Sequence, residues 1–476
     1  MISIVGIVLS LTLLIALAYR GISVLLLAPL MALLATLFSA DAPLLASYTQ
    51  VFMVALGGFV IAFFPLFLLG AVFGKLMGAS GAAAVIARTI VRWLGKEQAI
   101  LAIVLACAVL TYGGVSLFVV AFAIYPIAAA LFATADVPKR LIPATIALGA
   151  FTFTMTALPG TPAIQNAIPM PYFGTTPFAA PGLGMVGAAV MLVLGMLWLR
   201  RRAARAQRQG EGYGAPDDVA AQAAPSAGAA GSRGPSQGPD GGAAPFVRAM
   251  VPVVLVISLN YLLSTWLLPA LDTRYLAEPR FGATTIGALR GIWAVIGALG
   301  IAIVVLIGLH RRTLPDLKAA LEQGASASVL PLLNTASQVG YGAVIASLVG
   351  FALIRNAMLG VAPDNPLVSL SIAVNVLAGI TGSASGGMSI ALQTLGDHWL
   401  DMGRAAGIAP DLLHRVTAIA TGGLDALPHN GAVITLLGIC KLNHRQSYPD
   451  IFVVAVAIPL LALVVVVTLG SQFGSF

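Results

Sequence analysis

The chain has 476 residues, of which 59% are hydrophobic and only 9% are charged, and its mean hydropathy is +0.98. A soluble protein of this length needs far more charge to cover its surface, so the composition excludes that class and predicts an all-α polytopic membrane protein. The formal net charge of +8 comes from basic residues scattered among short loops, which is an orientation signal rather than a nucleic-acid-binding surface.

Apolar runs long enough to cross a hydrocarbon core of roughly 30 Å recur along the chain. The first, residues 2–18, predicts a spanning helix in the lipid bilayer. The alternative is a cleaved signal peptide ending at an Ala-Leu-Ala site, but no basic residue precedes this run. The later runs cover residues 22–39, 51–73, 182–199, 246–268, 286–309 and 451–469.

One long polar stretch, residues 200–245, divides the chain into transmembrane halves at residues 1–199 and 246–476. It begins with five arginines and continues as a low-complexity mixture of Ala, Gly, Ser, Pro and Gln. Such a segment buries too little apolar surface to offset its ordering entropy, so we expect a disordered linker. By the positive-inside rule the arginines predict a cytoplasmic linker and an N-terminus outside, and we expect the chain in a bacterial inner (plasma) membrane.

Residues 98–134 begin and end beside basic residues, although they are long enough for two half-spans. Gly113 and Gly114 lie near their midpoint. Glycine permits tight backbone reversals, so this segment predicts a re-entrant hairpin that enters the membrane and returns to the same side.

The two halves share a pair of short motifs in the same order. Gly-Gly-Val-Ser begins at Gly113, and Pro159 of an Ala-Leu-Pro motif follows 45 residues after the second glycine. Gly-Gly-Met-Ser begins at Gly386, and Pro428 of a second Ala-Leu-Pro follows 41 residues after its second glycine. Chance is the alternative, because these residues are abundant here. We predict two inverted repeats with helices broken at mid-membrane.

Interrupted helices expose free backbone N–H groups that bind an anion without a full buried charge. We therefore expect the breaks to bind substrate through small and hydroxyl-bearing residues; the alternative is that small residues pack helices tightly. The candidates in the first half are Gly113, Gly114, Ser116, Gly160, Thr161 and Gln165. Those in the second half are Ser383, Ser385, Gly386, Gly387, Ser389, His429 and Asn430.

Asp425 and His429 are also the candidates for proton coupling. An acid within an apolar span is costly and usually serves a site or a proton path, and imidazole exchanges protons near neutral pH. We expect residues 411–427 to form a helix that carries Asp425 in its last turn and ends at Pro428. The alternative is an acid at the membrane edge in contact with water.

Other polar groups point to no cofactor. The streak Asn334, Thr335, Ser337 and Gln338 either lines a cavity or forms interhelical hydrogen bonds. The two cysteines lie in apolar segments and are expected to be small buried hydrophobes. The sequence has no Walker A motif and no zinc-ligand or iron–sulfur spacing, so we expect no cofactor, no metal and no energy from ATP.

Three segments resemble the gluconate permease family of the ion transporter superfamily. They are residues 156–166 (TALPGTPAIQN), 382–392 (GSASGGMSIAL) and 422–436, which begins GGLDALPHNGAVI. The last most resembles the branch of D-beta-hydroxybutyrate permeases and differs from the sugar-acid members around residues 425–430. The resemblance covers essentially the whole chain apart from the linker.

The resemblance implies a proton symporter for a small organic acid anion, a hydroxycarboxylate such as 3-hydroxybutyrate. It also implies re-entrant hairpins and a homodimer that moves a transport domain against a scaffold in an elevator fashion. Four alternatives stay open at this point: a sugar-acid symporter, sodium coupling or exchange of the same acids, a passive anion channel, and an intramembrane hydrolase using a serine with His429 and Asp425.

Overall fold

The computed structural model describes residues 2–20, 22–39, 42–214, 243–314, 316–360, 362, 365–428 and 430–476, and in these ranges all regular structure is helical. The first half contains α1 (Ile2–Tyr19), α2 (Val24–Leu37), α3 (Leu44–Ala46), α4 (Met53–Ala79), α5 (Ala82–Leu94), α6 (Ala99–Tyr112), α7 (Leu117–Thr134), α8 (Ile142–Ala150), α9 (Phe153–Thr156), α10 (Ile164–Ala167), α11 (Pro169–Phe173) and α12 (Pro181–Arg208). The second half contains α14 (Ala243–Leu262), α15 (Leu268–Ala270), α16 (Ile286–His310), α17 (Leu317–Ser347), α18 (Phe351–Gly360), α19 (Pro366–Thr381), α20 (Ala384–Ala405), α21 (Pro410–Thr421), α22 (Gly431–Cys440), α23 (His444–Phe452) and α24 (Ile458–Phe473).

Within the described ranges, seven helices are long and apolar enough to cross a membrane, and the number rises to eight with the pair α5–α6, which bends by 108°. The all-α polytopic class is therefore confirmed. The seven are Leu44–Ala79, Leu117–Thr134, Pro181–Arg208, Pro245–Ala270, Ile286–His310, Leu317–Ser347 and His444–Phe473.

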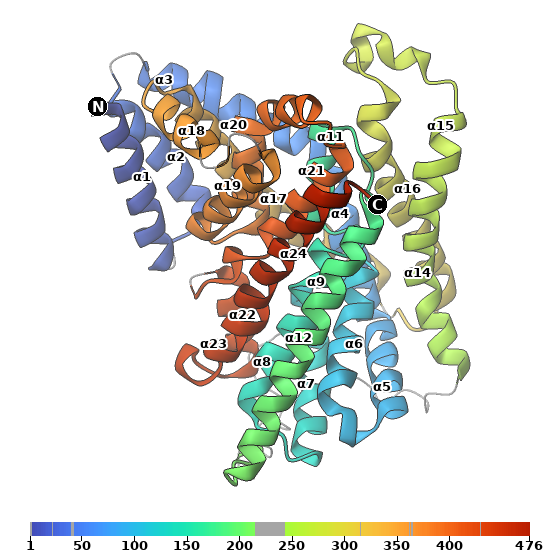
Figure 1. The fold of residues 1–476 in the computed structure, drawn as a ribbon. Coiled ribbons are helices and arrows are strands. Elements are labelled where there is room, and N and C mark those ends of the chain that lie inside the picture. The colour runs from blue at the N-terminus through green and yellow to red at the C-terminus, as the bar shows by residue number, and fades with distance from the viewer. Residues whose placement is uncertain are drawn as a thin grey trace.

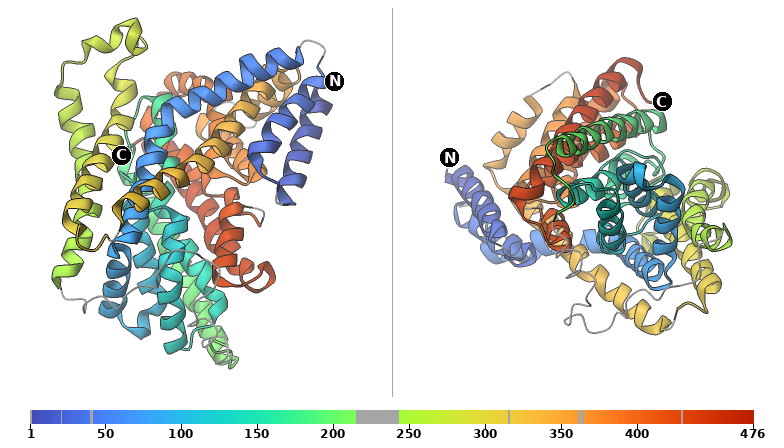
Figure 2. Two further views of the ribbon diagram at one scale, coloured as in Figure 1. Left: turned by 180° about the vertical axis from the view of Figure 1, so that it is seen from behind. Right: turned by 90° about the horizontal axis from the view of Figure 1, so that it is seen from below.

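The long helices α4 and α17 pack along each other and form the centre of a frame. The pair α1–α2 packs against α17 at one edge, while the pair α14–α16 packs against α4 at the opposite edge (Figures 1 and 2). The other long elements lie between these edges: α6 to α12 from the first half, and α19 to α24 from the second.

The two halves of the chain meet along their last helices. α12 packs against α24, and the Gly182 amide at the start of α12 donates a hydrogen bond of 2.8 Å to the Phe476 carbonyl at the end of the chain. Because the beginning of one helix meets the end of the other, the two are antiparallel. α12 ends at the bottom of Figure 1 and α14 begins at its lower right, and we call this lower end of the molecule the linker end.

The arginine cluster is ordered, contrary to the prediction for residues 200–214. α12 continues through Arg208, and its end is held by ion pairs: Arg202 Nε lies 2.7 Å from the buried Asp450, which also binds Arg140 at 3.0 Å. Arg140 forms a second ion pair of 2.6 Å with Glu211. Alanine and arginine are good helix formers, so the basic composition favours continuation of the helix. Residues 215–242 of the predicted linker lie outside the described residues.

Candidate functional site

The segment around Gly113 forms the predicted helical hairpin, here called hairpin 1, with α6 and α7 as its arms. Gly114 adopts a left-handed φ of +92°, which reverses the chain without steric cost, and Ser116 is the N-cap residue before α7. Both ends of the hairpin lie beside the end of α12, where Arg200 Nη2 donates a hydrogen bond of 2.7 Å to Gln98. The hairpin therefore starts and finishes at the linker end.

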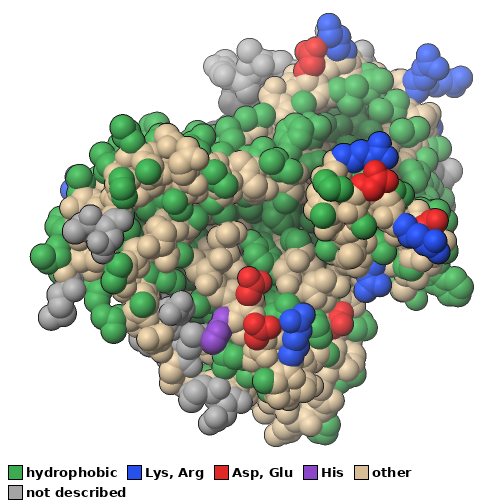
Figure 3. Space-filling model, turned by 90° about the horizontal axis from the view of Figure 1, so that it is seen from above, with side chains coloured by type: hydrophobic (Ala, Val, Ile, Leu, Met, Phe, Trp, Pro, Cys, Tyr) green, Lys and Arg blue, Asp and Glu red, His purple; other side chains and the backbone are tan. Residues whose placement is uncertain are grey.

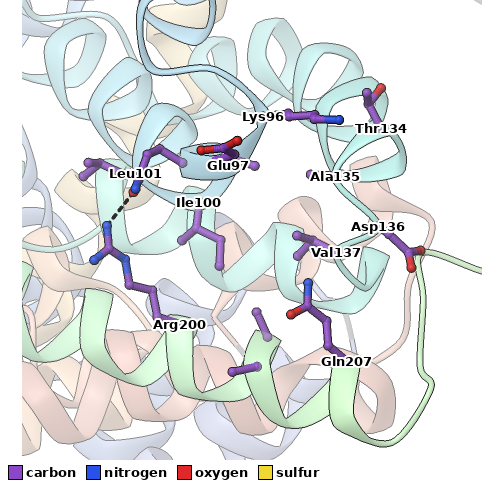
Figure 4. Close-up of a pocket in the computed structure, with 14 residues that line it drawn as sticks. Lys96, Glu97, Ile100, Leu101, Thr134, Ala135, Asp136, Val137, Arg200 and Gln207 are labelled. Atoms are coloured by element: carbon purple, nitrogen blue, oxygen red, sulfur yellow. Dashed lines mark hydrogen bonds between the residues drawn. The ribbon is translucent and has the colours of Figure 1, made fainter.

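Figure 4 shows a pocket at these feet of hairpin 1, between the α5–α6 turn, the end of α7 and α12. Its lining includes Lys96, Glu97, Asp136, Arg200 and Gln207. It contains none of the residues predicted to bind substrate, so we assign it no part in the candidate site.

The first break, residues 157–163, follows α8 and α9 and contacts the tip of hairpin 1. The Tyr112 hydroxyl donates a hydrogen bond of 2.6 Å to the Pro159 carbonyl, and the Pro162 ring packs against Gly114. Gly160 has a φ of +80°; its amide donates to the Pro177 carbonyl at 2.8 Å, and its carbonyl accepts from Asn260 of α14 at 3.1 Å. The tip and the break are thus one connected unit.

Two predicted ligands of the first half are buried beside this break. Thr161 is buried, and its carbonyl accepts a hydrogen bond of 3.0 Å from Asn166. The Oε1 atom of Gln165 is buried and has no hydrogen-bond partner among the described residues. A buried acceptor without a donor is uncommon and costs about 1–3 kcal/mol, so Gln165 is the best-supported ligand candidate of this half.

Hairpin 2 consists of α19 and α20 and reverses at Gly382 (φ +60°) and Ser383. Ser383 Oγ accepts a hydrogen bond of 3.1 Å from the Gly386 amide and thereby caps α20. Ser385 Oγ lies 3.4 Å from Ser383 Oγ and 3.2 Å from Thr335 Oγ1 of α17. Three hydroxyl groups therefore gather at this tip.

The two glycines of hairpin 2 are closely packed. A Cβ atom at Gly387 would overlap the Ala378 backbone of the facing arm, and one at Gly386 would overlap the Gln338 carboxamide. Gln338 Oε1 is buried and unpaired in the described part of the chain, as is Ser389 Oγ. Binding of substrate by these glycines stays a prediction, while the packing reason for glycine at both positions is observed.

The second break, residues 422–430, differs from the expected continuous helix. α21 ends at Thr421 because Gly422 and Gly423 follow, and Asp425 lies in a separate 3-10 turn, Leu424–Ala426. Asp425 is half-buried and forms no ion pair with any residue that the structure describes. His429, its predicted partner, lies outside the described residues.

Asn430 connects the second break to hairpin 2. Its Oδ1 accepts hydrogen bonds from the Ala432 and Val433 amides at 2.6 and 3.1 Å and so caps α22. Its Nδ2 donates to the Gly382 carbonyl at the hairpin tip, at 3.0 Å. Each half of the chain thus joins its own hairpin tip to its own break by a side-chain hydrogen bond.

Sequence reasoning missed a buried polar cluster on α21. Arg415 and His414 have no exposed surface, and both bind Asn166 Oδ1 at 3.1 Å. His414 Nδ1 lies 2.6 Å from Thr175 Oγ1, so the threonine donates to Nδ1 if Nε2 carries the proton for Asn166. The missed signal is an arginine and a histidine inside an apolar helix, where ionisable residues generally mark function.

The same cluster brings the two breaks together. Arg415 Nη1 donates to the Thr156 carbonyl at 3.3 Å, and the Thr156 side chain packs beside Gly422. The first break and the start of the second break therefore lie side by side. Across the described ranges, no group of three or more His, Cys, Asp or Glu side chains could hold a metal ion.

On the face opposite the linker end, seen in Figure 3, hydrophobic side chains alternate with other uncharged surface, and charged side chains of both signs occur in several separate groups. At the linker end, by contrast, Arg248, Arg311 and Arg312 surround one pocket, close to where α14 begins and α16 ends. Three arginines thus lie close together at the linker end, and the cytoplasmic location of this end stays a prediction of the positive-inside rule.

No protein-family model matches the chain. A curated relative, named uncharacterized transporter YxjC and found in Bacillus subtilis (strain 168), is 46% identical over 473 residues, covering 98% of both chains. The chain belongs to the family of this transporter. It is accordingly an integral membrane protein of a transporter family, consistent with a function other than catalysis.

The crystal structure of the Alcanivorax borkumensis YdaH transporter shares the fold, with a TM-score of 0.52 and 16% identity over 99% of this chain and 98% of that one. At this identity the similarity concerns the fold alone. Membership of the gluconate permease family stays a prediction.

Proposed function

We propose that this transporter is a proton-coupled symporter of a small hydroxycarboxylate such as 3-hydroxybutyrate, working by alternating access in the bacterial inner membrane. The observation that carries the proposal is that each hairpin tip is hydrogen-bonded to the break of its own half, while Thr156, which Arg415 binds, packs beside Gly422 of the second break. Helix ends at such breaks offer backbone N–H groups to a carboxylate, and hydroxyl groups at hairpin 2 offer partners for a substrate hydroxyl.

The arrangement of the two halves supports inverted repeats. Each half contains a helix pair, a long frame helix, a hairpin, a broken helix and a final helix, in that order. The final helices α12 and α24 are antiparallel, and α1 and α14 run in opposite directions in Figure 1. Two related units of opposite direction exchange conformations between inward-open and outward-open states, which is the usual basis of alternating access.

The position of Asp425 supports proton coupling. The second break has an acid that is half-buried and forms no ion pair with a described residue, so it can gain and release a proton without disturbing a structural pair.

We further propose that the frame helices act as a scaffold in a homodimer while the hairpins and breaks move in an elevator fashion. The linker is then in the cytoplasm.

The test is uptake of labelled 3-hydroxybutyrate into proteoliposomes, with and without an inward proton gradient and with gluconate as competitor. The proposal expects concentrative uptake that requires the gradient and that gluconate barely inhibits. Strong competition by gluconate would assign the substrate to the sugar acids. Uptake that is equal with and without the gradient would contradict proton coupling.

A further inference from the structure

The guanidinium of Arg415 is a permanent cation in the interior, with no carboxylate beside it. Arg415 has no exposed surface, and none of the ion pairs in the described part of the chain includes it. Asp411, one turn earlier on the same helix, does not pair with it. Burial of an unpaired charge is costly, so other groups must stabilise this cation.

The stabilising groups are neutral oxygen atoms on both sides of the first break. Arg415 Nε and Nη2 donate to the Ala179 carbonyl at 3.0 and 2.8 Å, and Nη2 also donates to the Pro177 carbonyl at 3.3 Å. Nη1 donates to the Thr156 carbonyl at 3.3 Å and to Asn166 Oδ1 at 3.1 Å. Three carbonyls and one carboxamide therefore surround one positive charge.

Carbonyl oxygens freed by an unwound helix are the ligands with which broken-helix transporters coordinate a coupling Na⁺. At the first break the same kind of oxygens bind a side chain that keeps its charge at every physiological pH and offers five N–H donors in a fixed plane. A dissolved cation would have to displace all of these hydrogen bonds in order to bind there.

Among its described residues, the second break has no such permanent cation. α8 leads to the first break in the same way as α21 leads to the second break. Unlike α21, α8 contains no basic residue, so it supplies no cation to the carbonyls of the second break. The carbonyls of the second break accept from uncharged or titratable groups instead: Tyr448 binds the Ala426 carbonyl at 3.2 Å, and His444 Nε2 lies 2.9 Å from the Pro428 carbonyl. The fixed charge thus belongs to one break, and the acid Asp425 belongs to the other.

We propose that Arg415 is a tethered substitute for a metal cation, which permanently fills a carbonyl-lined cation site at the first break so that no Na⁺ is needed there. The consequence for transport rests on the proposed function. The inference that Arg415 fills the cation site does not rest on the proposed function, because it can be tested on purified protein without any substrate.

The first experiment compares the melting temperature of the purified full-length protein in NaCl and in choline chloride at equal ionic strength. Arg415→Ala leaves an oxygen-lined space, so Na⁺ should raise its melting temperature by about 2 °C or more, with saturation, because a bound ion stabilises the folded state. Arg415→Met fills the space with an apolar chain and is the matched control. The wild type and Arg415→Met should show no difference between the two salts.

Equal melting temperatures of folded Arg415→Ala in both salts would overturn the inference, as would a Na⁺ shift of equal size in the wild type and the variant. If Arg415→Ala fails to fold, the inference is tested on the wild type by the salt dependence of uptake. Its uptake of labelled 3-hydroxybutyrate at fixed pH should agree within twofold in Na⁺ and choline, and a tenfold loss without Na⁺ would overturn the inference. Absence of uptake in both salts counts against the proposed function only, and the salt dependence of the wild-type melting temperature then decides.

Discussion

Arg415 of α21 donates a hydrogen bond of 3.1 Å to Asn166 of α10 and so joins residues 249 positions apart in the chain. The Asn166 carboxamide uses both of its ends. Its oxygen accepts from Arg415 and His414, and its nitrogen donates to the Thr161 and Pro177 carbonyls at 3.0 and 2.9 Å. One side chain therefore connects the first break to the helix that leads into the second.

Asn166→Ala should destabilise the protein strongly. The substitution leaves buried donors and acceptors without partners, and each such group costs about 1–3 kcal/mol. The free energy of unfolding of the purified protein in detergent measures this effect. Asn334→Ala is the matched control, because Asn334 Oδ1 has no hydrogen-bond partner within the described ranges and its loss should be nearly neutral. Equal losses for the two variants would contradict the role given to Asn166.

Gly387→Ala should separate the arms of hairpin 2. The added methyl group would overlap backbone atoms of Ala378, which cannot rotate away as a side chain can, and overpacking of this kind costs about 1–3 kcal/mol. A lower melting temperature is the expected result. In contrast, Gly438→Ala in α22 meets open space and should stabilise the helix by about 0.5–1 kcal/mol. A Gly387→Ala protein as stable as the wild type would contradict this prediction, because it would show that the two arms can move apart at little cost in free energy.

The sequence predicts the reversal of hairpin 1 and the two Ala-Leu-Pro breaks, because glycine and proline act locally on the backbone: Gly114 has a left-handed φ, and both motifs lie where helices stop. In the second half the predicted glycine pair, Gly386 and Gly387, lies in the first turn of α20, and the chain reverses four residues earlier, at Gly382. The prediction of a helix over residues 411–427 is wrong at its end, because α21 stops six residues earlier, at Thr421, where Gly422 and Gly423 follow. Glycine pairs end helices as effectively as proline when tertiary contacts favour the stop.

The cluster around Arg415 could not be predicted from the local sequence. Its partners include the backbone carbonyls of Thr156, Pro177 and Ala179, and every residue type has such a carbonyl, so the sequence does not indicate which ones bind the arginine. The order of residues 200–208 likewise depends on Asp450, which lies near the other end of the chain. Charge composition alone could not show that a buried carboxylate holds the end of α12.

The ion pair between Glu211 and Arg140 at the linker end should make stability depend on pH. Hydrogen bonds from the Arg140 guanidinium lower the pKa of Glu211. A lowered pKa means that the pair stabilises the protein fully above the unfolded-state pKa of about 4.3 and that this contribution is lost as the pH falls through the lower folded-state value. Because Glu211 is partly exposed, solvent screens the pair, and we expect about 0.2–1 kcal/mol.

Melting temperatures of the wild type and Glu211→Gln between about pH 3 and pH 7 measure this contribution. The difference should be constant near neutral pH, shrink at acidic pH and decrease with added salt. A difference that grows on acidification would contradict the assignment.

Asp425→Asn should separate the movement of substrate from the movement of protons. The amide keeps the size and hydrogen-bonding capacity of the carboxylic acid but cannot release a proton, so uptake against a concentration gradient should be abolished. Exchange of labelled for unlabelled substrate across proteoliposomes should remain, because exchange requires the conformational change without net release of the proton. Asp397→Asn, at an exposed acid of α20, is the control and should retain both activities. Full concentrative uptake by Asp425→Asn would remove Asp425 from the coupling step and leave the two breaks as a binding site only.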